Sequence, residues 1–174
     1  MLKVILKYGI IASVIIAIMM PTVAWNDTII RSDYAALIGY TILIIAFSMI
    51  FVAVGRYSES LADGKISFGK AFLIGLGISF MATLVYVIAW GLIDGFSGGE
   101  FLDRYADNML SELKEEGATA EEIKNMEKQM DAYRDWYATP ISKMVLTSTE
   151  IFPVGVFVSL ITALIFKFRK KRKI

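Results

Sequence analysis

Glu150 is the residue whose type and position most directly suggest chemistry. It lies in an apolar stretch, residues 144–166, that contains no other charged side chain. An ionisable group in a membrane segment is costly, and by default it marks an ion, proton or substrate path, or a hydrogen bond between helices. Pro153 has no N–H for the Thr149 carbonyl, as in the broken helices whose carbonyls bind cations in transporters. Glu150, Thr149 and Pro153 therefore form our candidate intramembrane site for a cation or proton.

The same residues also have a purely structural interpretation. If the last helix begins near Ile151, Glu150 is a first-turn acid that the helix dipole favours. Ser148 or Thr149 is then the N-cap, and Pro153 falls in the first turn, where its missing N–H matters least. Glu150→Gln should abolish a cation- or pH-dependent activity under the first interpretation, and should change only stability under the second.

The composition excludes several classes of chemistry. The chain has no Cys, and so no disulfide, thiolate zinc site, iron–sulfur cluster or thiol nucleophile. It has no His, and so no imidazole base, haem histidine or ordinary catalytic triad. The formal net charge of +1 is too small for the protein as a whole to attract nucleic acid electrostatically. Any catalysis would have to come from carboxylates, Lys, Tyr or Ser alone. We expect no enzyme activity, no cofactor, no metal and no nucleic-acid partner.

Four apolar windows must position the candidate site. They cover residues 4–24, 34–54, 71–93 and 144–166, and their only charged side chains are Lys7 and Glu150. About 20 apolar residues, at a rise of 1.5 Å each, cross a hydrocarbon layer about 30 Å thick. We predict an all-α integral membrane protein in which the whole chain, residues 1–174, forms a single domain built on a four-helix bundle in the lipid bilayer.

The distribution of Lys and Arg predicts the orientation. Eleven of the 18 basic residues lie in short segments on the side that carries both termini, six of them in residues 167–173. On the other side, residues 94–143 contain 12 carboxylates against six basic side chains. The positive-inside rule places both termini in the cytoplasm and residues 94–143 in an extracytoplasmic position. The basic tail is also expected to contact anionic lipid.

The first window has a second interpretation as a signal peptide cut after Ala24. Lys3 and Lys7 precede an apolar run, and small residues occupy the −3 and −1 positions of the cleavage site. The run is nevertheless long enough to cross a membrane, and Trp25 follows it as an interface anchor. We expect an uncut span, which the N-terminal mass of the mature protein would test.

Residues 97–140 are predicted to form a helical hairpin between the third and fourth spans. Each arm carries one apolar stripe at helical spacing: Leu102, Tyr105, Met109 and Leu113 in the first, and Ile123, Met126, Met130, Tyr133 and Tyr137 in the second. Gly117 supplies a stop, Thr119 and Glu122 have the spacing of a capping box, and Pro140 ends the second arm.

One stripe per arm cannot form a large core. The arms must therefore pack on each other, on a second copy of the chain or on the membrane surface. Met and Tyr suit a partner-binding groove, although Met is also ordinary core filling. The candidate partner face consists of Met126, Met130, Tyr133 and Tyr137.

Small residues recur every four positions in three of the four spans. They are Gly9, Ser13 and Ala17 in the first, Ala71, Gly75 and Ser79 in the third, and Gly155, Ser159 and Ala163 in the fourth. Such stripes let helices approach closely in lipid. We expect them to pack within one chain, with a homo-oligomer formed through one stripe as the alternative.

Several short runs stand in a characteristic order along the chain: Lys7–Ile10, Gly39–Thr41, Gly64–Phe72, Tyr86–Trp90, Tyr137 with Pro140, and Glu150–Gly155 with Ser159–Leu160. Together they resemble the bacterial multi-pass membrane family catalogued as domain of unknown function 4199. The runs Gly64–Phe72 and Glu150–Gly155 are the most specific, whereas the residues after Arg56 depart from the family's pattern. The resemblance implies a multi-pass protein of the inner membrane with an uncut first span, and it implies no activity.

These observations predict a non-enzymatic accessory or interaction protein of the cell envelope, which acts through the hairpin or the surface of the bundle. The partner would be another membrane protein or a second copy of the chain. The alternative is a small transporter or channel component that uses Glu150, as an oligomer, since one acid in four spans is little for a complete carrier. An intramembrane enzyme would require Glu150, Asp94 and Tyr86 to meet near the outer face.

Overall fold

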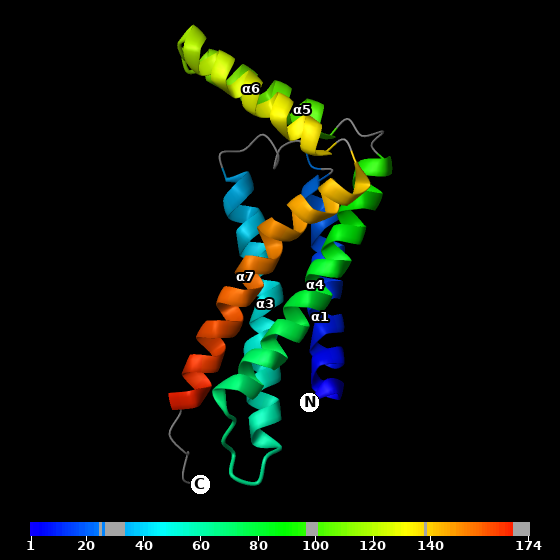
Figure 1. Cartoon of the computed structure of the whole chain (residues 1–174), viewed down its shortest axis with the longest axis vertical. Helices are drawn as coiled ribbons and strands as arrows, with labels where there is room; N and C mark the ends of the chain where they lie inside the picture. Colours follow the sequence, from blue (N-terminus) through cyan, green and yellow to red (C-terminus); the bar gives the residue numbers. More distant parts are fainter. Residues whose placement is uncertain (25, 27–33, 97–100, 138, 169–174) are drawn as a thin grey trace. The chain divides into compact units, whose positions relative to one another are not determined.

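The computed structural model describes residues 1–24, 26, 34–96, 101–137 and 139–168 (Figure 1). Within these ranges the chain forms six α-helices and no strand: α1 (Leu2–Ala24), α3 (Ala35–Glu59), α4 (Phe68–Phe96), α5 (Phe101–Glu115), α6 (Ala120–Tyr137) and α7 (Pro140–Phe168). Helices α1, α3, α4 and α7 are long and apolar enough to cross a membrane. The predictions of an all-helical chain and of four candidate spans are confirmed.

Helices α3, α4 and α7 extend beyond the predicted apolar windows. A polar side chain does not stop a helix unless it competes for the backbone, so charged turns continue these elements past the apolar part. Arg56 and Glu59, in the last turn of α3, form an ion pair of 3.6 Å one helical turn apart. The connection to α4 then turns at Gly64, whose φ of 59° lies in the left-handed region that glycine tolerates.

The chain divides into two compact units. The first unit comprises residues 1–88 and 148–174, and the second comprises residues 89–147. The first unit thus contains α1, α3, most of α4 and most of α7, while the second contains α5, α6 and the remaining ends of α4 and α7.

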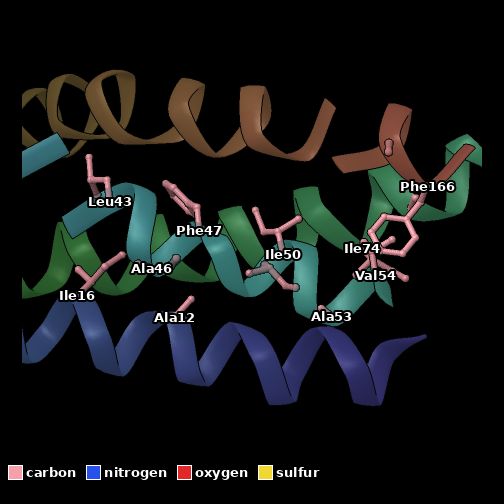
Figure 2. Packing of buried hydrophobic residues seen from close by; sticks show 14 of the residues in the cluster. Ala12, Ile16, Leu43, Ala46, Phe47, Ile50, Ala53, Val54, Ile74 and Phe166 are labelled. Carbon is pink, nitrogen blue, oxygen red and sulfur yellow. The ribbon is translucent and has the colours of Figure 1, made fainter. Parts of the chain in front are cut away.

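One apolar core joins the four helices of the first unit (Figure 2). Helix α3 supplies much of it and packs against α1; its buried core side chains are Leu43, Ala46, Phe47, Ile50, Ala53 and Val54. Phe166 of α7 closes one end, with its ring centre 5.0 Å from that of Phe51. Ile66, in the connection between α3 and α4, is buried in the same core.

Helices α4 and α7 approach closely through glycine and serine. A Cβ added to Gly75 would lie 2.6 Å from Ser159 Cβ, and one added to Gly155 would lie 2.6 Å from Ser79 Cβ. Real Cβ atoms do not come this close, so only glycine fits at either position. Because lipid is as apolar as the core, close backbone approach rather than the hydrophobic effect holds such helices together. The small-residue stripes of α4 and α7 therefore pack within one chain, as predicted.

Helices α1 and α4 also meet at glycines, each of which is opposite a larger side chain. A Cβ at Gly9 would lie 2.7 Å from Met81 Sδ, and one at Gly77 would lie 2.8 Å from Ile5 Cγ2. In the first contact the glycine belongs to α1, and in the second contact it belongs to α4. Gly9 of the α1 stripe therefore faces α4, and Ser13, the next residue of that stripe, is 6% exposed.

Large apolar side chains cover the outer surface of the first unit. They include Ile10 and Ile18 on α1, Ile44 on α3, Leu73 and Phe80 on α4, and Phe157 on α7. Soluble monomers rarely expose apolar patches of this extent, whereas lipid matches them. The surface agrees with the apolar length of the helices and indicates a membrane protein.

One end of the first unit is rich in exposed basic side chains. The start of α1, the connection between α3 and α4, and the end of α7 lie at the same end of this unit (Figure 1). The exposed basic residues in these segments and in the adjoining turns of α3 and α4 are Lys3, Lys7, Arg56, Lys65, Lys70 and Lys167. Residues 169–173 of the predicted basic tail, and Trp25, lie outside the described residues.

Candidate functional site

Glu150 lies inside a continuous helix. Helix α7 runs from Pro140 to Phe168 without interruption and passes through Pro153. Its start is set by Thr139, whose Oγ1 accepts a hydrogen bond of 3.2 Å from the Ser142 N–H, and by Pro140 in the first turn. The interpretation in which this helix begins near Ile151 is therefore wrong, because the Thr-Pro start signal stands eleven residues earlier in the chain.

As a result, Glu150 is not a first-turn acid, and neither Ser148 nor Thr149 is the N-cap of α7. Pro153 sits in the helix interior, where it has no N–H to donate to the Thr149 carbonyl. The broken-helix interpretation predicted this relation between Pro153 and Thr149, but the helix itself is unbroken.

Glu150, Thr149 and Pro153 are all exposed. Glu150 shares its face of α7 with Pro153 and Phe157, while Ile151 and Gly155 are buried on the other side. No hydrogen bond or ion pair joins Glu150 to another residue in the described part of the chain. The carboxyl group therefore faces away from the core of the first unit, and a path through the middle of one chain would not pass it.

The second unit contains a partly buried ion pair that sequence analysis did not assign. Lys143, near the start of α7, contacts Asp94, near the end of α4, and Asp94 is 5% exposed. Lys143 Nζ also lies 5.7 Å from the centre of the Tyr137 ring. The signal was present in the sequence, because Asp94 directly follows the third apolar window and Lys143 directly precedes the fourth.

This ion pair has a structural role. A carboxylate this deeply buried is stable only when it is paired and hydrogen-bonded, and Lys143 supplies the opposite charge. The pair thereby joins the ends of two candidate spans. Asp94, one of the residues that an intramembrane enzyme would require, is held in this contact.

Helices α5 and α6 pack against each other in the second unit. Among the described side chains of these two helices, Ala106 of α5 and Met130 of α6 are the buried apolar ones, at 0% and 4% exposure. Arg134 of α6 joins the two helices by a bond of 2.9 Å from its Nε to Asp103 Oδ1. It also bonds Asp131 at 3.0 Å, and the hydrogen bonds to Asp103 and Asp131 raise the pKa of Arg134.

The turn between α5 and α6 has the predicted chemistry. Gly117 adopts a φ of 77°, the left-handed conformation that ends a helix. The Thr119 N–H and the Thr119 hydroxyl donate to Glu122 Oε2, each at 2.8 Å, and the Glu122 N–H donates to Thr119 Oγ1 at 3.3 Å. These bonds complete the capping box. The bond from the Thr119 N–H makes the larger contribution to lowering the pKa of Glu122, and the bond from the Thr119 hydroxyl makes the smaller one.

The four residues of the candidate partner face differ in exposure. Met130 is buried, Met126 and Tyr137 are half-buried, and Tyr133 is 45% exposed. Trp136, which was not assigned to this face, is 57% exposed. The side chains of Leu102 and Tyr105, in the predicted stripe of the first arm, lie outside the described residues. Part of the predicted face is thus used for packing inside the unit, and Tyr133 is its exposed residue.

A family model described as "Protein of unknown function (DUF4199)" matches residues 7–167. The matched range includes the whole second unit and most of the first, and it confirms the resemblance drawn from the short sequence runs. No curated protein and no solved structure matches the chain.

Proposed function

The chain belongs to the DUF4199 family, and on this premise we propose that it is a non-enzymatic accessory or interaction protein of the cell envelope. Its four apolar helices form a bundle in the cytoplasmic (inner) membrane, with both termini in the cytoplasm. Helices α5 and α6 form an extracytoplasmic hairpin that binds another membrane protein. The exposed basic residues at one end of the first unit support this orientation.

The exposed aromatic side chains of α6 carry the proposal. Tyr133 and Trp136 are 45% and 57% exposed on a helix that is otherwise highly charged. Tyr and Trp supply most of the binding energy in many protein interfaces, because they bury a large rigid surface and keep a polar group for hydrogen bonding. Packing of α6 on α5 already uses Met130 and Arg134, and it leaves these two aromatic rings accessible.

Site-specific photocrosslinking in living cells tests this proposal. A photoreactive phenylalanine analogue replaces Tyr133 or Trp136 in the full chain, and the control replaces Lys124. Lys124 is also exposed, and it lies nine residues from Tyr133, two and a half turns away on the opposite face of α6. We expect one adduct of defined mass from positions 133 and 136 and none from position 124. No adduct, or the same adducts from all three positions, would contradict the proposal.

The transporter or channel alternative, with Glu150, Thr149 and Pro153 at its site, stays a prediction. Because Glu150 is exposed on the outer face of α7, such a path would have to run between chains. Ion flux into liposomes containing only the purified chain, abolished by Glu150→Gln, would favour this alternative over the accessory role.

A further inference from the structure

One face of α7 in the first unit combines an apolar surface with a single acid. We call it the α7 outer face; its residues are Glu150, Pro153, Phe157, Leu160 and Leu164, and all are exposed. Their spacing alternates between three and four residues, which keeps them on one side of the helix. The same spacing lets two helices pack side by side along their length.

Glu150 has an unusual depth along its helix. In the described parts of the four candidate spans, every other Asp, Glu, Lys or Arg lies within two turns of a helix end. Glu150 lies seven residues beyond Lys143, about 10 Å further along the axis, which is more than a glutamate side chain can reach. Facing lipid alone, its carboxyl group would have no hydrogen-bond partner, which is a costly state in hydrocarbon.

The opposite side of α7 is already occupied. Gly155 and Ser159 pack against Ser79 and Gly75 of α4, so this side has no room for a further helix. The α7 outer face is the side that remains for a contact with another molecule.

We propose that two copies of this chain associate through the α7 outer face, with the two Glu150 carboxyl groups hydrogen-bonded to each other. In a two-fold symmetric dimer, a residue near the axis faces its own copy. Hydrocarbon favours the neutral carboxyl group, which both donates and accepts a hydrogen bond and is therefore complementary to itself. Each copy supplies the polar partner that the other lacks.

Lys143, Arg134 and Lys167 of a second copy do not offer a better partner. Lys143 is paired with Asp94, and Arg134 is paired with Asp103 and Asp131. On α7 itself, Lys167 lies 17 residues beyond Glu150, about 25 Å away along the axis. The carboxyl group of the second copy is the complementary group at this depth. The proposed interface does not use α5 or α6. Its test is therefore independent of the proposal that α5 and α6 bind another membrane protein.

Disulfide trapping tests the interface, because the native chain has no Cys. Phe157→Cys places one thiol on the α7 outer face, and Phe80→Cys places one on α4. The two phenylalanines are a matched pair, with exposures of 62% and 63%. In membranes at low protein density, we expect copper phenanthroline to link two copies of the Phe157→Cys chain and to leave the Phe80→Cys chain monomeric. Equal linking of both variants, no linking of Phe157→Cys, or a product whose mass is not twice that of the chain would overturn the proposal.

Substitutions of Glu150 in the Phe157→Cys chain test the hydrogen bond. Glu150→Leu cannot form it, and we expect association to weaken about five- to thirty-fold in a dilution series in lipid. Glu150→Gln can still donate and accept, and should dimerise nearly as well as the parent. Unchanged dimerisation of Glu150→Leu would overturn the role of the carboxyl pair. An unchanged far-UV circular dichroism spectrum establishes that each variant is folded.

Discussion

Ser79 Oγ and Ser159 Oγ lie 3.3 Å apart in the core of the first unit, at the point where α4 and α7 cross. Each hydroxyl group also donates to the carbonyl of a glycine four residues earlier in its own helix, Gly75 at 2.9 Å and Gly155 at 2.7 Å. The two helices therefore meet through two matching contacts, in which the serine of each helix faces the glycine of the other helix. This contact fixes their register and distance.

Gly75→Ala should destabilise the protein by about 1–3 kcal/mol, because the added methyl group would overlap Ser159 and force α4 and α7 apart. Gly39→Ala is the matched control, since it is also a glycine in an apolar helix but a Cβ there meets nothing within 4 Å. Unfolding of both variants in mixed micelles with increasing SDS, followed by circular dichroism, measures the difference. Equal unfolding midpoints would show that the crossing is not tightly packed.

Lys143→Met should destabilise the second unit by about 3 kcal/mol or more, because it leaves the buried Asp94 carboxylate without its cation. The double variant Lys143→Met/Asp94→Asn should recover much of the loss, since it removes the uncompensated charge. Hydrogen exchange at the ends of α4 and α7 measures the effect, and Lys124→Met, at an exposed position of α6, serves as the control. A double variant no more stable than the single one would argue against a charge pair.

The capping box should respond to acid. The pKa of Glu122 is lowered by its bonds to Thr119, so its stabilising contribution is fully present above the ordinary carboxyl range and is lost as the pH falls through the lower folded value. In NMR spectra of the full chain in micelles, the Thr119 amide signal should titrate below that ordinary range. Glu122→Gln should abolish the titration. A midpoint at or above the ordinary glutamate value would show that the box does not form.

Accessibility of single cysteines tests the orientation. Lys124→Cys in α6 and Ala62→Cys in the connection between α3 and α4 are both exposed positions. In intact cells we expect a membrane-impermeant maleimide to label position 124 and not position 62. After the cells are opened, both should react. Labelling of position 62 alone in intact cells would reverse the proposed topology.

The main elements could be predicted from the sequence because each rests on a local pattern. The apolar windows predict four helices, and Gly117, Thr119 and Glu122 predict the turn between α5 and α6 at single-residue resolution. The ends of α3 and α7 were less predictable. Hydropathy indicates the length of the apolar segment, but it does not indicate the residue at which the hydrogen bonds of the helix backbone end. Thr139 and Pro140 carried that information for α7 as an N-terminal signal.

The candidate site was predictable only in part. The sequence identifies Glu150 as an isolated acid, but which side of α7 it occupies depends on which neighbours α7 packs against. The positions of Gly155 and Ser159 settle that question, because they face α4 and turn Glu150 outward. Asp94 and Lys143 are 49 residues apart in the chain, and their pairing follows from tertiary structure that no local pattern encodes.

The contacts between α1 and α4 bear on how related chains can diverge. Gly9 makes room for Met81, and Gly77 makes room for Ile5, so the constraint falls on the combined volume of each pair rather than on either residue alone. In an alignment of the family, positions 9 and 81 should covary, with a larger residue at one accompanied by a smaller residue at the other. Positions 5 and 77 should do the same, and the two pairs should vary independently of each other.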